Sequence, residues 1–174
     1  KFPYWDTVLH TLNGFLCGAI GFSLVEIMNG NKRLRFELSP LFMAVVAFCF
    51  SMTIGVTWEI FEFSMDSLYH LDMQKDTIIH SIYTVSLDPM NDNNCVAVTG
   101  IEDVVLNGRD LGLGGYLDIG LMDTMYDLIV NFIGAFVFSV LGYGYVKYKD
   151  TKSFVNGLIP ESWSDEKKAG SHTE

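Results

Sequence analysis

Three long apolar blocks constrain this chain more than any other feature of its sequence. They run from Thr7 to Met28, from Leu41 to Met65 and from Thr124 to Val146. Each block has at least the roughly 20 residues that an α-helix needs to cross the hydrocarbon core of a bilayer. A soluble protein would need a much larger core than 174 residues provide to bury all three. We therefore predict an all-α membrane protein, a multi-pass helical bundle with three transmembrane helices in this chain.

The composition supports this class and excludes others. Hydrophobic residues make up 49% of the chain and charged residues only 18%, against about 25% charged residues in an average soluble domain. The formal net charge of −10 argues against a nucleic-acid partner. The first block lacks the basic start of a signal peptide. Because residue 1 is Lys rather than Met, we expect that further membrane helices precede this segment.

The basic residues predict an orientation. Eight of the 11 Lys and Arg residues lie in the 29–40 loop or after Val146, which places that side in the cytoplasm. The chain then divides into four segments. These are two transmembrane helices with a short cytoplasmic loop in 1–66, an extracytoplasmic insert in 67–122, a third transmembrane helix in 123–149, and a polar cytoplasmic tail in 150–174 that we expect to be disordered.

The insert has a different character from the apolar blocks. Residues Asp72–Leu87 fit a short amphipathic helix or a strand lying on the membrane surface. Residues Cys95–Asp118 contain β-rich pieces separated by the turn signals Asn107-Gly108 and Gly114-Gly115. We therefore expect an insert that consists of a short helix and a small β-hairpin packed on the membrane face.

Each apolar block also carries a polar stripe that leads into a seam of small residues. In the second block Ala47, Ser51, Gly55 and Glu59 recur every four residues and so share one helix face. Small residues at this interval mark the face on which membrane helices approach closely. The other blocks repeat the pattern, with Asp6, His10 and Asn13 before Gly14, and Asp123, Asp127 and Asn131 before Gly134.

In an up-and-down bundle the three stripes lie at one level, near the outer membrane face. The predicted acidic cluster consists of Asp6, His10, Glu59, Glu62, Asp66, Asp123, Asp127 and Asn131. Helix capping is an equal explanation for Asp6, Asp66 and Asp123. Glu59 and Asp127 lie about 9 Å and 6 Å inside their blocks by helical rise, where a charge costs about 1–3 kcal/mol. Their retention favours a function, while Asp6, Asn13 and Asn131 fit structural polar roles.

Carboxylates this close together cannot all stay ionised without a proton or a cation. An oxygen-rich site suits Ca²⁺, Mg²⁺ or Mn²⁺, or Zn²⁺ if an imidazole also ligates, so a divalent cation is the candidate cofactor. The candidate ligands are His10, Glu59, Glu62, Asp66, Asp123 and Asp127. Such a metal could activate water, or Glu59 and Glu62 could act as general acid and base. The candidate catalytic residues are Glu59, Glu62, Asp127 and His10.

Three segments carry a resemblance to a known family. They are WDTVLHTLNGF (Trp5–Phe15), SPLFMAVVAFCFSMTIGVTWEIFEFSMD (Ser39–Asp66) and GGYLDIGLMDTMYDLIVNFIGA (Gly114–Ala135). The chain resembles the YjdF-type bacterial integral membrane proteins, which are broadly similar to VanZ-like proteins. The motif positions coincide with the acidic cluster, and much of Ile78–Leu113 departs from the shorter members. The resemblance implies a membrane protein with additional N-terminal helices, but no agreed reaction.

The sequence leaves three functions open, and whether the chain is an enzyme stays undecided. The first is a cell-envelope protein that binds or modifies a lipid-linked or amphipathic ligand from the outer leaflet. The second is a proton- or cation-coupled transporter that uses the same acids as a relay. The third is a structural or assembly subunit whose acids hold partner helices. Membrane lipid, a second copy of the chain or other helices are the expected partners.

Overall fold

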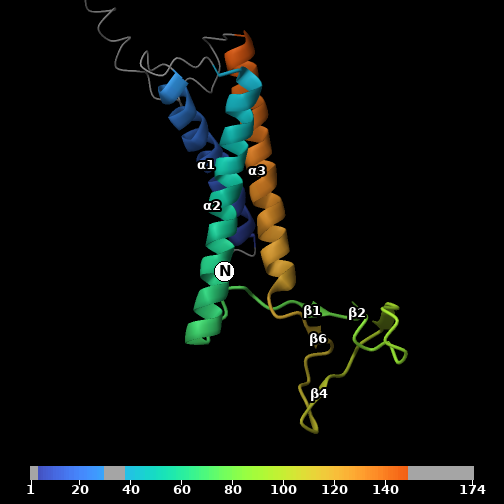
Figure 1. The fold of residues 1–174 in the computed structure, drawn as a ribbon. Helices are drawn as coiled ribbons and strands as arrows, with labels where there is room; N and C mark the ends of the chain where they lie inside the picture. The colour runs from blue at the N-terminus through green and yellow to red at the C-terminus, as the bar shows by residue number, and fades with distance from the viewer. Residues whose placement is uncertain (1–3, 30–37, 149–174) are drawn as a thin grey trace, which may run out of the picture. The chain divides into compact units, whose positions relative to one another are not determined.

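The computed structural model describes residues 4–29 and 38–148, and three long helices dominate it (Figure 1). They are α1 (Trp5–Asn29), α2 (Pro40–Tyr69) and α3 (Leu121–Tyr148). Each is long and apolar enough to cross a membrane, which confirms the predicted class of helical membrane protein. The predicted orientation depends on basic residues of the 29–40 loop and of the tail after Val146, and the predicted disorder concerns residues 150–174. These segments lie largely outside the described residues.

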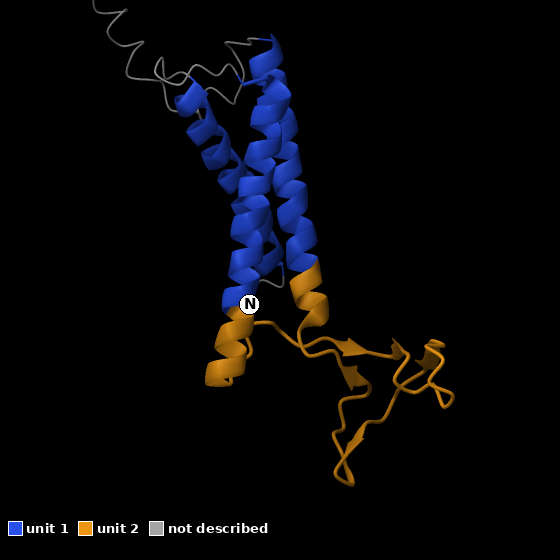
Figure 2. Ribbon diagram, in the orientation of Figure 1, with its two compact units in different colours: residues 1–61, 126–174 blue, residues 62–125 orange. Residues whose placement is uncertain are grey.

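The chain forms two compact units, which Figure 2 colours separately. Unit 1 comprises residues 1–61 and 126–174, and unit 2 comprises residues 62–125. The boundaries between the units therefore fall inside α2 and α3. In the sequence analysis, residues 66, 122 and 149 mark the predicted boundaries of the membrane-spanning segments. These boundaries stay predictions.

Unit 1 owes its core to small residues that let large side chains fill the space between the helices. Phe22 and Phe138 are fully buried, and their rings meet edge to face with 6.1 Å between centroids. Gly18 and Gly142 lie directly against these rings, where a Cβ atom would meet them at 3.3 Å and 2.8 Å. The outward faces of the same helices are apolar and exposed, as expected for helices that contact lipid.

Unit 2 contains three separate two-stranded antiparallel sheets. Their strands pair as β1 (Ile78–Ile79) with β6 (Tyr116–Leu117), β2 (Ser81–Thr84) with β3 (Val96–Thr99), and β4 (Val105–Leu106) with β5 (Arg109–Asp110). Asn107 and Gly108 join the last pair with φ values of 52° and 77°. A two-residue turn with positive φ at both positions matches the twist of a hairpin, and it confirms the predicted turn.

The short helix considered for Asp72–Leu87 is wrong, and the strand alternative is present. The Asp66 carboxylate accepts the N–H groups of Met73 and Gln74, and Asp118 accepts that of Thr77, so these N–H groups are bonded to side chains instead of to helix carbonyls. Residues 78–84 are rich in β-branched and aromatic side chains, which favour strands.

The hairpin expected within Cys95–Asp118 is present only as β4 and β5. Its neighbours β3 and β6 pair instead with strands that come before residue 95. Local turn residues predict a hairpin between adjacent strands, but they carry no information about a partner that is distant in the sequence.

Candidate metal centre

His10 lies on the buried face of α1 and forms the centre of a cluster of carboxylates. Its side chain is 9% exposed. Asp6 precedes it by one helical turn, so both side chains lie on the same side of α1. The distance from His10 Nε2 to Asp6 Oδ1 is 3.8 Å. One helix therefore supplies an imidazole and a carboxylate to the same point.

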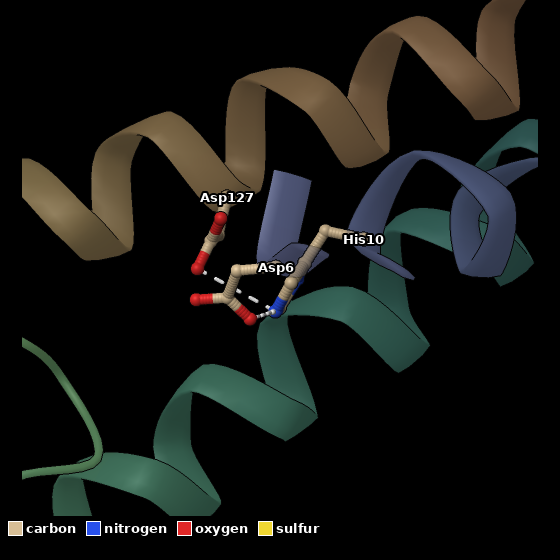
Figure 3. A group of neighbouring side chains, drawn as sticks. All are labelled: Asp6, His10 and Asp127. Carbon is tan, nitrogen blue, oxygen red and sulfur yellow. Dashed lines mark ion pairs between the residues drawn. The ribbon is translucent and has the colours of Figure 1, made fainter. Parts of the chain in front are cut away.

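The other two helices of unit 1 each add one buried carboxylate. Asp127 of α3 is 5% exposed, and its Oδ2 lies 3.4 Å from His10 Nε2. Glu59 of α2 is 6% exposed, and its Oε1 lies 3.8 Å from His10 Nδ1. Figure 3 shows Asp6 and Asp127 directed toward the same imidazole nitrogen. Both ring nitrogens of His10 thus face carboxylates.

Glycines make this convergence possible, because they bring the helix backbones into contact next to the cluster. A Cβ atom at Gly134 of α3 would collide with the carbonyl oxygen of Thr11 and lie 2.9 Å from the amide nitrogen of Phe15 on α1. Gly14 of α1 meets Asn131 of α3 in the same way. Since these contacts lie within about one turn of His10 and one to two turns of Asp127, they fix the separation of the two side chains.

Asn131 fills the space between all three helices. It is 1% exposed and lies between Gly14 of α1 and Gly55 of α2. Its amide nitrogen is 3.5 Å from Met52 Sδ. The hydroxyl of Ser51 also donates a 2.7 Å hydrogen bond to the carbonyl oxygen of Gly14. The packing is consistent with the structural role expected for Asn131.

Three carboxylates surround one imidazole in this cluster. Those of Glu59 and Asp127 are buried, and that of Asp6 is half-buried. Carboxylates this close together favour the binding of protons or of a cation.

The donor atoms fit a small divalent cation. One nitrogen of His10 and one oxygen each from Asp6 and Asp127 all lie within 4.8 Å of one another. In a tetrahedral zinc site with bonds of about 2.1 Å, ligand atoms are separated by about 3.4 Å. The 3.4 Å between His10 and Asp127 matches this separation, and the 3.8 Å to Asp6 needs only a small side-chain adjustment.

The remaining predicted residues have other surroundings. Asn13 is exposed on α1, where its side-chain oxygen faces the Cys17 thiol at 3.4 Å. Glu62 is 8% exposed and belongs to unit 2. Asp66 accepts two backbone N–H groups at 2.7 Å and 2.8 Å, and Asp123 accepts that of Lys75 at 3.0 Å. These two carboxylates organise the chain of unit 2, and their metal-ligand roles stay predictions.

Unit 2 has an acidic hollow that the sequence did not single out. Asp66, Asp72 and Asp76 line a pocket of about 360 Å³. Partial desolvation, followed by the charges of Asp72, Asp118 and Asp66, raises the pKa of the Asp76 carboxyl above its usual value. Asp66 belongs to the acidic cluster predicted from the sequence, but that prediction did not group it with Asp72 and Asp76, which follow it within 10 residues, after the end of α2.

A family model covers most of the chain. The model of DUF2238, described as predicted membrane protein, matches residues 1–148. No curated protein and no solved structure matches the chain. The match agrees with the resemblance to YjdF-type membrane proteins, while the broader similarity to VanZ-like proteins stays a prediction.

Proposed function

The chain belongs to the DUF2238 family of predicted membrane proteins, and we propose that its Asp6–His10–Asp127 cluster binds a divalent cation. The cation then serves hydrolysis or group transfer on the polar part of an amphipathic or lipid-linked ligand. One observation carries this proposal. A buried imidazole nitrogen faces two carboxylates, one from its own helix and one from α3, at 3.8 Å and 3.4 Å.

The donor set supports zinc or manganese in preference to calcium. Calcium takes six to eight oxygen ligands, whereas one imidazole with two carboxylates suits a smaller transition-metal site. Catalytic zinc sites typically have three protein ligands and keep one position for water or substrate. A metal at such a site lowers the pKa of its bound water and so supplies a nucleophile at neutral pH.

Glu59 supports this chemistry from the other side of the imidazole. Its carboxylate lies 3.8 Å from His10 Nδ1. A carboxylate on the second ring nitrogen of a ligating histidine fixes the tautomer and the orientation of the ring. We assign Glu59 this positioning role, which leaves Nε2 of His10 to face Asp6 and Asp127.

The position of the cluster along the helices supports an amphipathic ligand. Asp6 is the second residue of α1, and Asp127 is the seventh residue of α3. By helical rise these positions are within about 9 Å of the helix starts, the depth at which lipid headgroups meet acyl chains. A ligand with a polar group and a lipid tail would reach the cluster there. An outer-leaflet ligand follows from the orientation predicted by the basic residues.

The packing of unit 1 favours this function over a transport pathway. Beyond the cluster, Phe22, Ala47 and Phe138 are fully buried and fill the space between the helices. A proton or cation relay needs ionisable groups at intervals through the membrane, and beyond the cluster the described residues of unit 1 contain one further carboxyl, that of Glu26 on α1. The role of a structural or assembly subunit stays a prediction of the sequence.

Metal binding by the purified full chain tests the proposal. We expect stoichiometric Zn²⁺ or Mn²⁺ by elemental analysis after equilibration with either metal alone. His10→Gln and Asp127→Asn should weaken binding by more than about 100-fold, beyond the loss typical of an outer-shell partner, and Glu59→Gln by about 10- to 100-fold. Matched controls are His70→Gln and Asp92→Asn, which change exposed residues of unit 2.

A control measurement distinguishes a variant that has lost a metal-ligating side chain from a variant that does not fold. Each variant is first compared with the wild type in elution profile and melting temperature in the same detergent. A wild-type protein that binds neither metal contradicts the proposal. Unchanged affinity in His10→Gln or Asp127→Asn does so as well.

A further inference from the structure

A second feature of unit 1 lies between α2 and α3, which run side by side in Figure 1. It is an apolar groove of about 450 Å³. We propose that this groove holds one acyl chain of an anionic phospholipid, with the lipid phosphate beside Lys147. The site is independent of the metal centre. Tyr143 in the groove is 16 residues beyond Asp127 on α3, about 24 Å along the helix.

The walls of the groove are suited to an alkyl chain. Phe48 of α2 meets Phe132 of α3 edge to face at 5.2 Å between ring centroids, and Phe132 stacks on Phe136 at 6.1 Å. These rings and the aliphatic side chains beside them line the groove, and almost none of its lining is polar. An acyl chain would therefore replace water or loosely packed lipid with continuous apolar contact.

The dimensions favour a single acyl chain over a helix. On α3 the lining runs from Phe132 to Tyr143, about 16 Å by helical rise. One leaflet contributes about 15 Å to the hydrocarbon core of a bilayer, so the groove is as long as a lipid chain in one leaflet. A helix with its side chains is about 10–12 Å across, and a groove of about 450 Å³ would hold only part of such a cylinder.

The end of the groove at Tyr143 provides the groups that recognise an anionic headgroup. Lys147 follows Tyr143 by one turn, and its Nζ lies 5.2 Å from the centroid of the Tyr143 ring. Tyrosine and lysine at the end of a membrane helix sit at headgroup level, and lysine attracts anionic lipids. The helix α2 begins at Pro40 beside the lining residue Leu41, so its positive N-terminal end faces the same region.

The charge distribution selects a phospholipid with net negative charge. Among the described residues, this part of α3 has two cation–aromatic contacts. Lys147 makes both of them, one with Tyr143 and one with Tyr148. No acidic side chain of residues 40–48 or 136–148 competes for the ammonium group. A zwitterionic headgroup would bring its own cation near Lys147, whereas an anionic headgroup brings only the phosphate charge.

Lipid titration of the purified full chain tests this inference. The delipidated protein is titrated with phosphatidylglycerol or with phosphatidylcholine of the same acyl chains, and bound lipid is counted by native mass spectrometry. We expect phosphatidylglycerol to bind about fivefold more tightly, the factor that one lysine contributes near an anionic lipid. Lys147→Gln should remove this preference, and Lys147→Arg should retain it.

A matched pair of valines tests the groove itself. Val140 lines the groove, whereas Val137 does not, and the two are 53% and 45% exposed on the same helix. Val140→Trp should fill the groove and reduce the binding of both lipids severalfold, while Val137→Trp should leave binding unchanged. Because both side chains are on the surface of the bundle, neither change should prevent folding, which the melting temperature verifies.

Three results would overturn the inference. The first is equal affinity of the wild type for the two lipids. The second is equal lipid binding by Val140→Trp and Val137→Trp. The third is a wild-type dimer that Val140→Trp dissociates, because the groove would then hold a second copy of the chain instead of a lipid.

Discussion

Replacement of Gly134 by alanine is the most direct perturbation of the contact that positions the candidate metal centre. The added Cβ would collide with the Thr11 carbonyl oxygen and lie 2.9 Å from the Phe15 amide nitrogen. Both obstacles are backbone atoms, so no side-chain rotation can relieve them. Ordinary van der Waals contact begins at 3.4 Å, and the Phe15 contact alone therefore requires α1 and α3 to separate by about 0.5 Å.

The size of the effect follows from this separation. A gap of about 0.5–1 Å loses a quarter to a half of the dispersion energy of the atoms facing it. Overpacking of this kind costs about 1–3 kcal/mol, and the higher helix propensity of alanine returns about 1 kcal/mol. We expect a net loss of up to about 2 kcal/mol, which corresponds to a melting temperature up to about 4–8 °C lower for a chain of this size.

The assay is thermal unfolding of the detergent-solubilised protein, with Gly144→Ala as the control. A Cβ at Gly144 meets no heavy atom within 4 Å, so alanine there should leave the melting temperature unchanged or raise it slightly. The separation of α1 from α3 also widens the 3.4 Å gap between His10 and Asp127. Equal melting temperatures for the two variants would refute the close contact between the helices.

Two further predictions concern unit 2. Hydrogen bonds from backbone N–H groups, mainly that of Asn94 and then that of Met90, hold the pKa of the Asp88 carboxyl below its usual 3.8. The ionised carboxylate therefore stabilises the 88–94 loop fully above pH 3.8. This stabilisation is lost as the pH falls through the lower pKa of the folded state. The backbone amide of Asn94 should therefore be protected from hydrogen exchange at pH 5, and this protection should be lost in strong acid. An unprotected Asn94 amide at pH 5 would contradict the geometry. Asp66→Asn weakens two charge-assisted bonds worth about 1.5–3 kcal/mol each to Met73 and Gln74. Exchange of those amides should accelerate at least about tenfold, and the exposed control Asp72→Asn should not change it.

Much of the candidate site was predictable because helical spacing is a local property. His10, Glu59 and Asp127 each lie on the face that also carries the small residues of their helix, so the pattern identified the inward direction. The pattern could not say how near the side chains come. The glycine contacts at Gly14 and Gly134 determine that distance, and they depend on which helix faces which.

Other features had no local signal. The one-turn spacing of Asp6 and His10 predicted that they share a helix face, but the sequence assigned Asp6 a structural role, and only the fold brings Asp127 of α3 close enough to complete a donor set with Asp6 and His10. The exposed position of Asn13 separates it from the residues with which its stripe had grouped it. The groove between α2 and α3 depends on the contact of Phe48 with Phe132, two residues that are more than 80 positions apart in sequence.

The insert shows the same distinction. Asn107-Gly108 determines its own turn, because its two residues tolerate positive φ. The pairing of β1 with β6 joins segments about 38 residues apart, and no local pattern encodes that partner. By itself the sequence determined the helical membrane class and the inward polar faces, because hydrophobic length and helical period act along one chain. Only the tertiary structure decided the donor distances and the groove, because these arise where different helices pack together.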